Sequence, residues 1–269
     1  MSKPLPKELT SYDLLKTFAV VFMVVDHVGF YFFPDDNWWR VAGRLCVPVW
    51  FFLIGYANSR DLSPRLWAGA VILICSDILA GLYFFPLNIL ASMLIIRLSI
   101  DGLMQRALRS VSHFWAVITM LFLLAIPSGM VFEYGTLGFI LAIFGYLLRR
   151  RDELKLKYKE LLNHYFAFSA VAFIGLQSVL FGFETPQPMA LTAGIMVVMG
   201  ALYMFKPVTL PKLTEKMPRP FTWLLQLAGR RTMEIYVAHL LLFKILGVIY
   251  QPERFALLDW DLFYMGEDI

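Results

Sequence analysis

Residues 14–33 read LLKTFAVVFMVVDHVGFYFF, a mostly apolar run with one lysine near its start and the pair Asp26-His27 toward its end. At about 1.5 Å per residue, such a helix crosses about 30 Å, the thickness of the hydrocarbon core of a bilayer. The run is too long for the apolar centre of a signal peptide, and Pro34-Asp35-Asp36 follows it instead of a small-residue cleavage site. We therefore predict a retained membrane-spanning helix.

The composition extends this prediction to the whole chain. Of its 269 residues, 59% are hydrophobic and 16% are charged, whereas about a quarter of the residues in a soluble domain are charged. Scarce charge and the lack of repeats also exclude collagen-like, coiled-coil and disordered classes. We predict an all-α fold, a polytopic integral membrane bundle of about nine helices that forms one domain over 1–269.

The expected spans are the apolar runs of the sequence. Two of them, 88–100 and 135–149, are short enough to be half-spans. The full set is 14–33, 41–58, 67–85, 88–100, 114–132, 135–149, 163–181, 188–205 and 232–250.

The basic residues indicate the orientation of the bundle. With a cytoplasmic N-terminus, loops 149–162 and 206–220 lie inside and the tail 251–269 lies outside. The 24 basic residues then fall on the inner side except Arg40, Arg44, Lys244 and Arg254. We interpret the net charge of +4 as a topology signal, and we expect the lipid bilayer, not nucleic acid, as a partner.

Several common kinds of site have no motif here. Cys46 and Cys75 lie inside apolar runs, which is typical of small packing residues and not of a disulfide framework or a CxxC site. The sequence also lacks a glycine-rich phosphate loop, a GxSxG elbow and an HExxH pair. We therefore expect no metal site.

Ionisable residues inside spans are costly and often mark function. Helical rise places five of them in one layer in the outer half of the membrane, and places His239 and Glu234 lower, along an approach from the cytoplasm. Asn88, Glu133 and the neighbouring Tyr134 sit at outer ends. The five that share the outer layer are Asp26, His27, Arg44, Asp77 and Lys244.

Each of these residues also has a purely structural interpretation. Asp26 is expected to pair with Arg44 or with Lys244, and a pair with Arg44 would on its own lock two helices together. His239 suits a hydrogen-bonded residue of the bundle interior, and Lys244 suits a side chain that reaches up to the outer interface. Asn88 at a helix start suits an N-cap.

Five blocks of this sequence resemble, in order, the TraX family of membrane proteins. The family often has proline just before its last histidine, where this chain has Ala238. The blocks are Val25-Asp26-His27-Val28-Gly29, Gly43-Arg44-Leu45-Cys46-Val47-Pro48, Pro86-Leu87-Asn88, Phe132-Glu133-Tyr134-Gly135 and Tyr236-Val237-Ala238-His239-Leu240.

The resemblance implies a multi-pass protein of the bacterial inner membrane that belongs to the transmembrane acyltransferases. It implies transfer of acetyl from acetyl-CoA, without a metal, to an amine or hydroxyl of a protein, glycan or lipid acceptor, such as a pilin N-terminus in conjugation or another envelope component. It assigns His27 as general base or transient acyl carrier, beside Asp26 and Arg44. Residues expected to bind the donor or acceptor are Asn88, Asp77, Glu133, Tyr134, His239 and Lys244.

Two other functions remain open at this point. Buried acids, histidines and lysines also suit a proton-coupled transporter or flippase, although no internal repeat is visible. In a non-enzymatic assembly protein, the same residues would join helices through polar contacts worth about 0.6–2 kcal/mol each.

Overall fold

The structure, a computed structural model, describes residues 6–153 and 156–263. It is mostly helical, which confirms the all-α prediction, and one short parallel pair of strands is added, β1 (Tyr83–Phe85) with β2 (Asp261–Phe263). The helices are α1 (Ser11–Phe32), α2 (Asn37–Gly43), η1 (Arg44–Cys46), α3 (Val47–Tyr56), α4 (Pro64–Leu79), α5 (Ile89–Ala107), α6 (Val111–Leu123), α7 (Ala125–Gly129), α8 (Gly135–Arg149), α9 (Leu156–Leu180), α10 (Gln187–Tyr203), α11 (Pro211–Lys216), α12 (Arg219–Arg230) and α13 (Thr232–Tyr250).

The predicted number of spans is not confirmed. Among the described residues, two helices, α1 and α13, are long and apolar enough to cross a membrane by length and composition. The apolar helices α6, α8 and α10 are shorter. Every predicted run does contain helix, but turns and breaks shorten several of them, so the nine-span topology stays a prediction.

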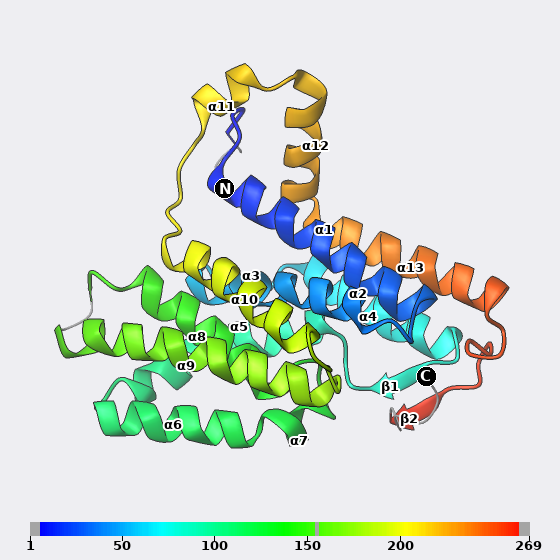
Figure 1. Cartoon of the computed structure of the whole chain (residues 1–269), viewed down its shortest axis with the longest axis horizontal. Coiled ribbons are helices and arrows are strands. Elements are labelled where there is room, and N and C mark those ends of the chain that lie inside the picture. Colours follow the sequence, from blue (N-terminus) through cyan, green and yellow to red (C-terminus); the bar gives the residue numbers. More distant parts are fainter. Residues whose placement is uncertain (1–5, 154–155, 264–269) are drawn as a thin grey trace.

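The first helix begins where its sequence provides a cap. The Thr10 side chain accepts a hydrogen bond from the Asp13 backbone N–H, and the Asp13 carboxylate accepts one from the Thr10 N–H at 2.9 Å. This reciprocal capping satisfies two backbone donors that a helix start leaves open. From there α1 runs to Phe32, and α13 lies beside its C-terminal half (Figure 1).

The predicted span 41–58 is broken, and Pro48 explains the break. In a continuous helix the N–H of residue 48 would donate to the Arg44 carbonyl, but proline has no N–H. The Val47 N–H donates to Arg44 instead, which makes the tighter turn of η1 between α2 and α3. The break places Arg44 at the joint, with its side chain directed at α1.

The packing core lies where α3 crosses α8. Two glycines allow the backbones to touch: a Cβ at Gly55 would lie 1.7 Å from the Ala142 carbonyl oxygen, and one at Gly145 would lie 2.2 Å from that of Phe52. Helices α5, α6, α9 and α10 pack around this pair. The result is a rigid wall on one side of the site described below.

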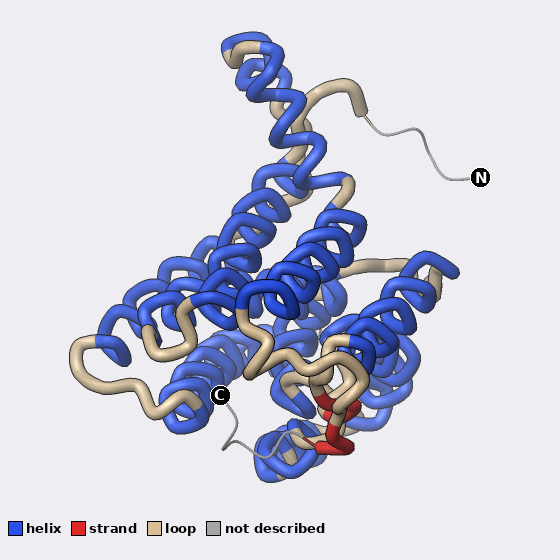
Figure 2. The backbone as a smooth tube through the Cα atoms, turned by 90° about the vertical axis from the view of Figure 1, so that its right-hand side faces the viewer, coloured by secondary structure: helices blue, strands red, loops and turns tan. Residues whose placement is uncertain are grey.

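The predicted loops and tail contain structure that the sequence did not indicate. The linker 206–220 holds α11, and α12 begins at its end; both stand out from the bundle over the start of α1 (Figure 1). The loop 149–162 is shorter than expected because α9 begins at Leu156, and its residues 154–155 lie outside the described residues. The tail contributes β2, at the far end of the molecule from α12 (Figure 2), and 264–269 lie outside the described residues.

Candidate active site

A cavity of about 1230 Å³ lies among α1, α4, α5 and α13. Its lining extends along α1 from Tyr12 to Tyr31 and along α13 from Thr232 to Lys244. At about 1.5 Å per residue, the stretch of α1 measures about 28 Å. The cavity therefore reaches from one end of the two long helices to the other.

The structure gathers the predicted site residues around this cavity, with one exception. His239 does not belong to the lining and lies behind it, in contact with His27. The predicted residues that do line the cavity are Asp26, His27, Arg44, Asp77, Asn88, Glu133, Tyr134 and Lys244.

The predicted pairing of Asp26 with Arg44 is confirmed. Arg44 Nη2 donates to Asp26 Oδ2, and Arg40 Nη1 lies 3.3 Å from the same oxygen. Gly43 makes this approach possible, because a Cβ at that position would lie 2.2 Å from the Asp26 Cβ. One buried carboxylate thus faces two arginines, so the group carries a net positive charge.

Arg44 is also bound to Tyr134, which begins α8. Arg44 Nη1 donates to the Tyr134 hydroxyl at 2.8 Å, and its guanidinium lies 4.8 Å from the centre of the Phe181 ring. Tyr134 has φ = 63°, a left-handed conformation that costs a non-glycine residue about 1–3 kcal/mol. Because the hydroxyl oxygen accepts from Arg44, its proton stays available to a ligand in the cavity.

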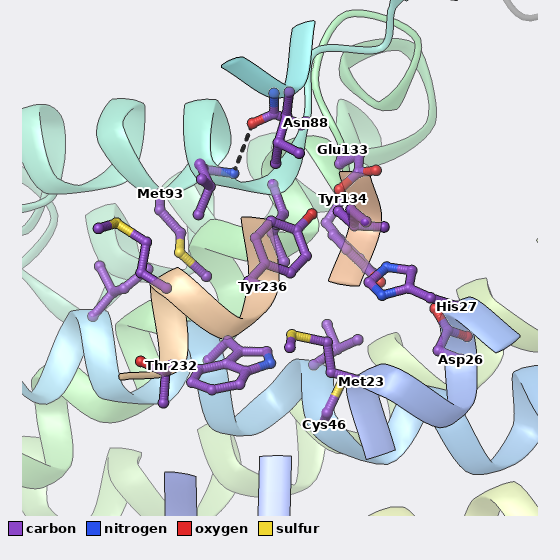
Figure 3. A pocket seen from close by; sticks show the side chains of 18 of the residues that line it. Met23, Asp26, His27, Cys46, Asn88, Met93, Glu133, Tyr134, Thr232 and Tyr236 are labelled. Carbon is purple, nitrogen blue, oxygen red and sulfur yellow. Dashed lines mark hydrogen bonds between the residues drawn. The ribbon is translucent and has the colours of Figure 1, made fainter. Parts of the chain in front are cut away.

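His27 is the histidine that lies next to this group. Figure 3 shows it beside Asp26 on α1, on the same side of the cavity as Glu133 and Tyr134. Its Nδ1 lies 2.7 Å from His239 Nε2, and His239 Nδ1 lies 2.7 Å from the Ile235 carbonyl oxygen. The ring is therefore held by a second histidine and not by Asp26, whose Oδ2 is bound to arginines.

The contact between the two histidines contradicts the predicted depth of His239. The sequence estimate placed it well below His27, on the assumption that both helices start at one membrane surface and run in parallel. In the structure the start of α1 is packed against α12, and α13 begins farther along α1 (Figure 1). This offset brings position 239 level with position 27.

Lys244 is buried, not directed to an outer interface as its structural interpretation held. Its ammonium lies 2.6 Å from Asp77 Oδ1 and donates to Ser76 Oγ at 2.7 Å and to the Leu73 carbonyl at 3.3 Å. An ammonium has three N–H groups, so these three acceptors use all of them. The contacts favour a structural role for Lys244, joining α13 to α4.

Asn88 and Glu133 close the cavity on the side of α5. Asn88 Oδ1 accepts from Leu90 N–H at 3.1 Å as the N-cap of α5 (Figure 3). The Asn88 side-chain amide donates to the Ala70 carbonyl at 2.9 Å. Glu133 lies in the connection between α7 and α8, where burial, together with the Asp77 carboxylate, raises the pKa of its carboxyl to about 7. Its carboxyl is therefore less acidic than that of an exposed glutamate.

The sequence analysis missed two residues of the site. Arg40 shares Asp26 with Arg44, and its guanidinium lies 4.9 Å from the centre of the Phe30 ring. The buried Tyr236 lines the cavity, with its ring centre 5.7 Å from that of His27. The three-residue spacing from Tyr236 to His239 was a usable signal, because it places both on one helix face.

Basic side chains line the end of the cavity nearest the start of α1. Lys16 and Arg97 are among them, and Arg97 donates to the Asp61 carbonyl at 2.8 Å. Arg230 is there too, but its Nε and Nη2 are both bound to Asp13, at 3.1 Å each. In residues 6–153 and 156–263, no group of three or more His, Cys, Asp and Glu residues is placed to hold a metal ion.

Comparison with known proteins identifies the family to which this geometry belongs. The sequence model described as "TraX protein" matches residues 11–247. The chain belongs to the TraX family. The matched range contains all of the motifs that carried the resemblance, including Asp26-His27, Gly43-Arg44 and His239.

Individual relatives match part of the chain. An uncharacterized protein of Rickettsia prowazekii is 30% identical over 149 residues, which are 55% of this chain and 60% of that protein. A protein TraX of Escherichia coli is 29% identical over 147 residues, 52% of this chain and 57% of that protein. The match thus covers less than two thirds of these TraX-like relatives. No solved structure matches the chain.

Proposed function

We propose that this TraX-family protein is a membrane acyltransferase that moves an acetyl group from acetyl-CoA to an amine or hydroxyl of an envelope component, such as a pilin N-terminus. One observation carries the proposal. His27 lines a cavity of about 1230 Å³ beside a carboxylate shared by two arginines and beside a tyrosine that can donate a proton. A base next to a positively charged hydrogen-bond donor suits acyl transfer.

In the proposed reaction, His27 takes the proton of the acceptor N–H or O–H as the acceptor attacks the thioester carbonyl. The Tyr134 hydroxyl, polarised by Arg44, donates to the oxyanion that forms. The carbon–sulfur bond then breaks, and the thiolate of CoA takes the proton back from His27. The products are the acylated acceptor and free CoA, with His27 neutral again.

The shape and charge of the cavity support two routes of approach. Lys16 and Arg97 at one end suit the phosphates of the donor, because fixed cations attract phosphate groups. Asp26, His27 and Tyr134 lie farther along the same cavity, toward the end that Phe85 and Phe263 line. A donor from the inner side and an acceptor from the outer side would meet at His27.

The surface of the bundle supports a multi-pass placement in the bacterial inner membrane. Val171 and Val179 on α9 are 70% and 74% exposed, and Val197 on α10 is 73% exposed. Similar large apolar side chains are exposed on α4, α6 and α13. Soluble monomers rarely leave so much apolar surface uncovered, whereas lipid is a favourable solvent for it.

The test uses membrane vesicles that contain the protein and measures two quantities. One is the transfer of radiolabelled acetyl from acetyl-CoA, and the other is the release of free CoA. His27→Gln should lower transfer by about 10²–10⁴-fold, the usual contribution of a positioned base. The matched control is His164→Gln, since His164 is exposed and outside the cavity. If the folded wild-type protein neither binds acetyl-CoA nor transfers acetyl, the proposal is refuted and a transporter or assembly role is favoured.

A further inference from the structure

We propose that His239 is a positioning residue that holds His27 in the tautomer with its proton on Nδ1, so that the lone pair of Nε2 is free for the reaction. The inference rests on the proposed function for its catalytic meaning. Its structural part concerns one proton in a chain of two hydrogen bonds, and it can be tested without any substrate.

The chain of bonds starts at a group whose role is fixed. The Ile235 carbonyl oxygen can only accept, and it lies 2.7 Å from His239 Nδ1. His239 Nδ1 must therefore carry a proton and donate it. In a neutral imidazole the second nitrogen then has none, so His239 Nε2 is an acceptor.

The second bond transmits this assignment to His27. His239 Nε2 lies 2.7 Å from His27 Nδ1 and, as an acceptor, requires a proton on that nitrogen. His27 is neutral before the reaction, so its own Nε2 has no proton. The nitrogen that is left with a lone pair is thus the one that can act as a base.

The surroundings keep both rings in place. Tyr236 packs against both rings, with its ring centre 5.7 Å from that of His27 and 5.8 Å from that of His239. Phe243 packs edge-on against His239 at 5.5 Å. His27 lines the cavity and His239 does not, so His239 acts on a substrate only through His27.

This arrangement assigns to a neutral histidine the task that a carboxylate performs in a serine hydrolase triad. Asp26, the adjacent carboxylate, does not perform it, because among the described residues it is bound to Arg40 and Arg44 and makes no hydrogen bond to His27. When His27 Nε2 takes a proton during the reaction, Nδ1 keeps its own proton and its bond to His239. Orientation is therefore preserved through the proton transfer.

The first experiment is nitrogen-15 NMR of protein labelled at histidine. The chain has four histidines, so few signals need to be assigned. Wild type should show His27 protonated on Nδ1. His239→Gln keeps a carbonyl oxygen that can accept from Nδ1, so it should keep this tautomer. His239→Phe fills the space of the ring without an acceptor, so His27 should change to protonation on Nε2.

The same variants give a matched kinetic test. With acetyl-CoA as donor, His239→Phe should lower kcat by about 10²-fold, the lower end of what a positioned base contributes, with KM for acetyl-CoA unchanged. His239→Gln should recover most of kcat. Rescue by glutamine is not expected if His239 only fills space.

The outcomes separate the two proposals. Nε2 protonation of His27 in wild type, or an unchanged tautomer and kcat in folded His239→Phe, would overturn the positioning role. If the phenylalanine variant does not fold, the wild-type and glutamine spectra decide. The expected tautomer without any acyl transfer would support the positioning of His27 and refute the acyltransferase assignment.

Discussion

Two ion pairs line the same cavity and differ in how many hydrogen-bonding groups around their cations remain without a partner. Lys244 donates all three of its protons, to Asp77, Ser76 and the Leu73 carbonyl. Arg44 is bound to Asp26 and to the Tyr134 hydroxyl, whose own proton remains available. In addition, Asp26 Oδ1 and Arg44 Nε are buried and make no hydrogen bond among the described residues.

Under the proposed function, the difference separates a structural ion pair from the group that takes part in the reaction. The pair Asp77–Lys244 is neutral and saturated, so a ligand gains little from it. The group of Asp26 with Arg40 and Arg44 carries excess positive charge next to His27. Buried charges with unused hydrogen-bonding capacity are expensive, and they are found most often where chemistry is done.

The largest expected effect is the loss of stability when the Asp77–Lys244 pair is broken. Lys244→Met leaves the partly buried Asp77 carboxylate without its cation and should lower the free energy of unfolding by about 3–5 kcal/mol. Acyl transfer per folded molecule should be unchanged. Denaturation in detergent measures the first quantity and vesicle assays the second. Restored stability in the double variant with Asp77→Asn would confirm that the unpaired charge is the cause.

The next effect should be on the reaction. Tyr134→Phe removes the proton offered to the oxyanion and should lower kcat by about 10²–10³-fold, as loss of one oxyanion donor does. The hydroxyl also accepts from Arg44, so a modest loss of stability is expected with it. Normal kcat in this variant would show that Tyr134 is as structural as Lys244.

A smaller effect is expected at Gly43, where α2 packs against Asp26 of α1. Gly43→Ala places a methyl group 2.2 Å from the Asp26 Cβ, so α2 must shift away from α1. Overpacking of this kind costs about 1–3 kcal/mol. Thermal unfolding should show it, and acyl transfer should fall as well because Arg44 moves. Gly175→Ala is a control, since a Cβ there meets nothing within 4 Å.

The smallest change tests whether Lys244 is saturated. Ser76→Ala removes one of its three acceptors and should cost about 1.5 kcal/mol, the lower end for a hydrogen bond to a charged group, because the other two acceptors remain. Transfer activity should stay at the wild-type level. A measurable fall in kcat without loss of stability would mean that Lys244 takes part in the reaction after all.

From the sequence, the residues of the candidate site could be predicted better than their arrangement in space. Asp26, Arg44 and Asp77 were recognised because charges in apolar runs are rare and need partners. Gly43 and Pro48, which belong to one motif, each have a physical reason. Gly43 allows α2 to approach Asp26, and Pro48 makes the break that directs Arg44 toward α1.

What sequence reasoning missed depends on where helices begin and how they cross. His239 was placed too low because the offset of α13 along α1 comes from α12 (Arg219–Arg230), a helix that none of the predicted spans contains. Arg40 was placed on the outer side because it lies between the predicted spans 14–33 and 41–58, and it was not expected to contact Asp26.

Under the proposed function, the pairing of β1 with β2 bears on how fast substrates would exchange. Phe85 and Phe263, stacked with ring centres 5.3 Å apart, both belong to the cavity lining, and they sit on strands of only three residues. A ladder of this length has little stability of its own. A bulky acceptor would thus pass this end by parting a few hydrogen bonds, while the packed helices stay closed around the reacting atoms.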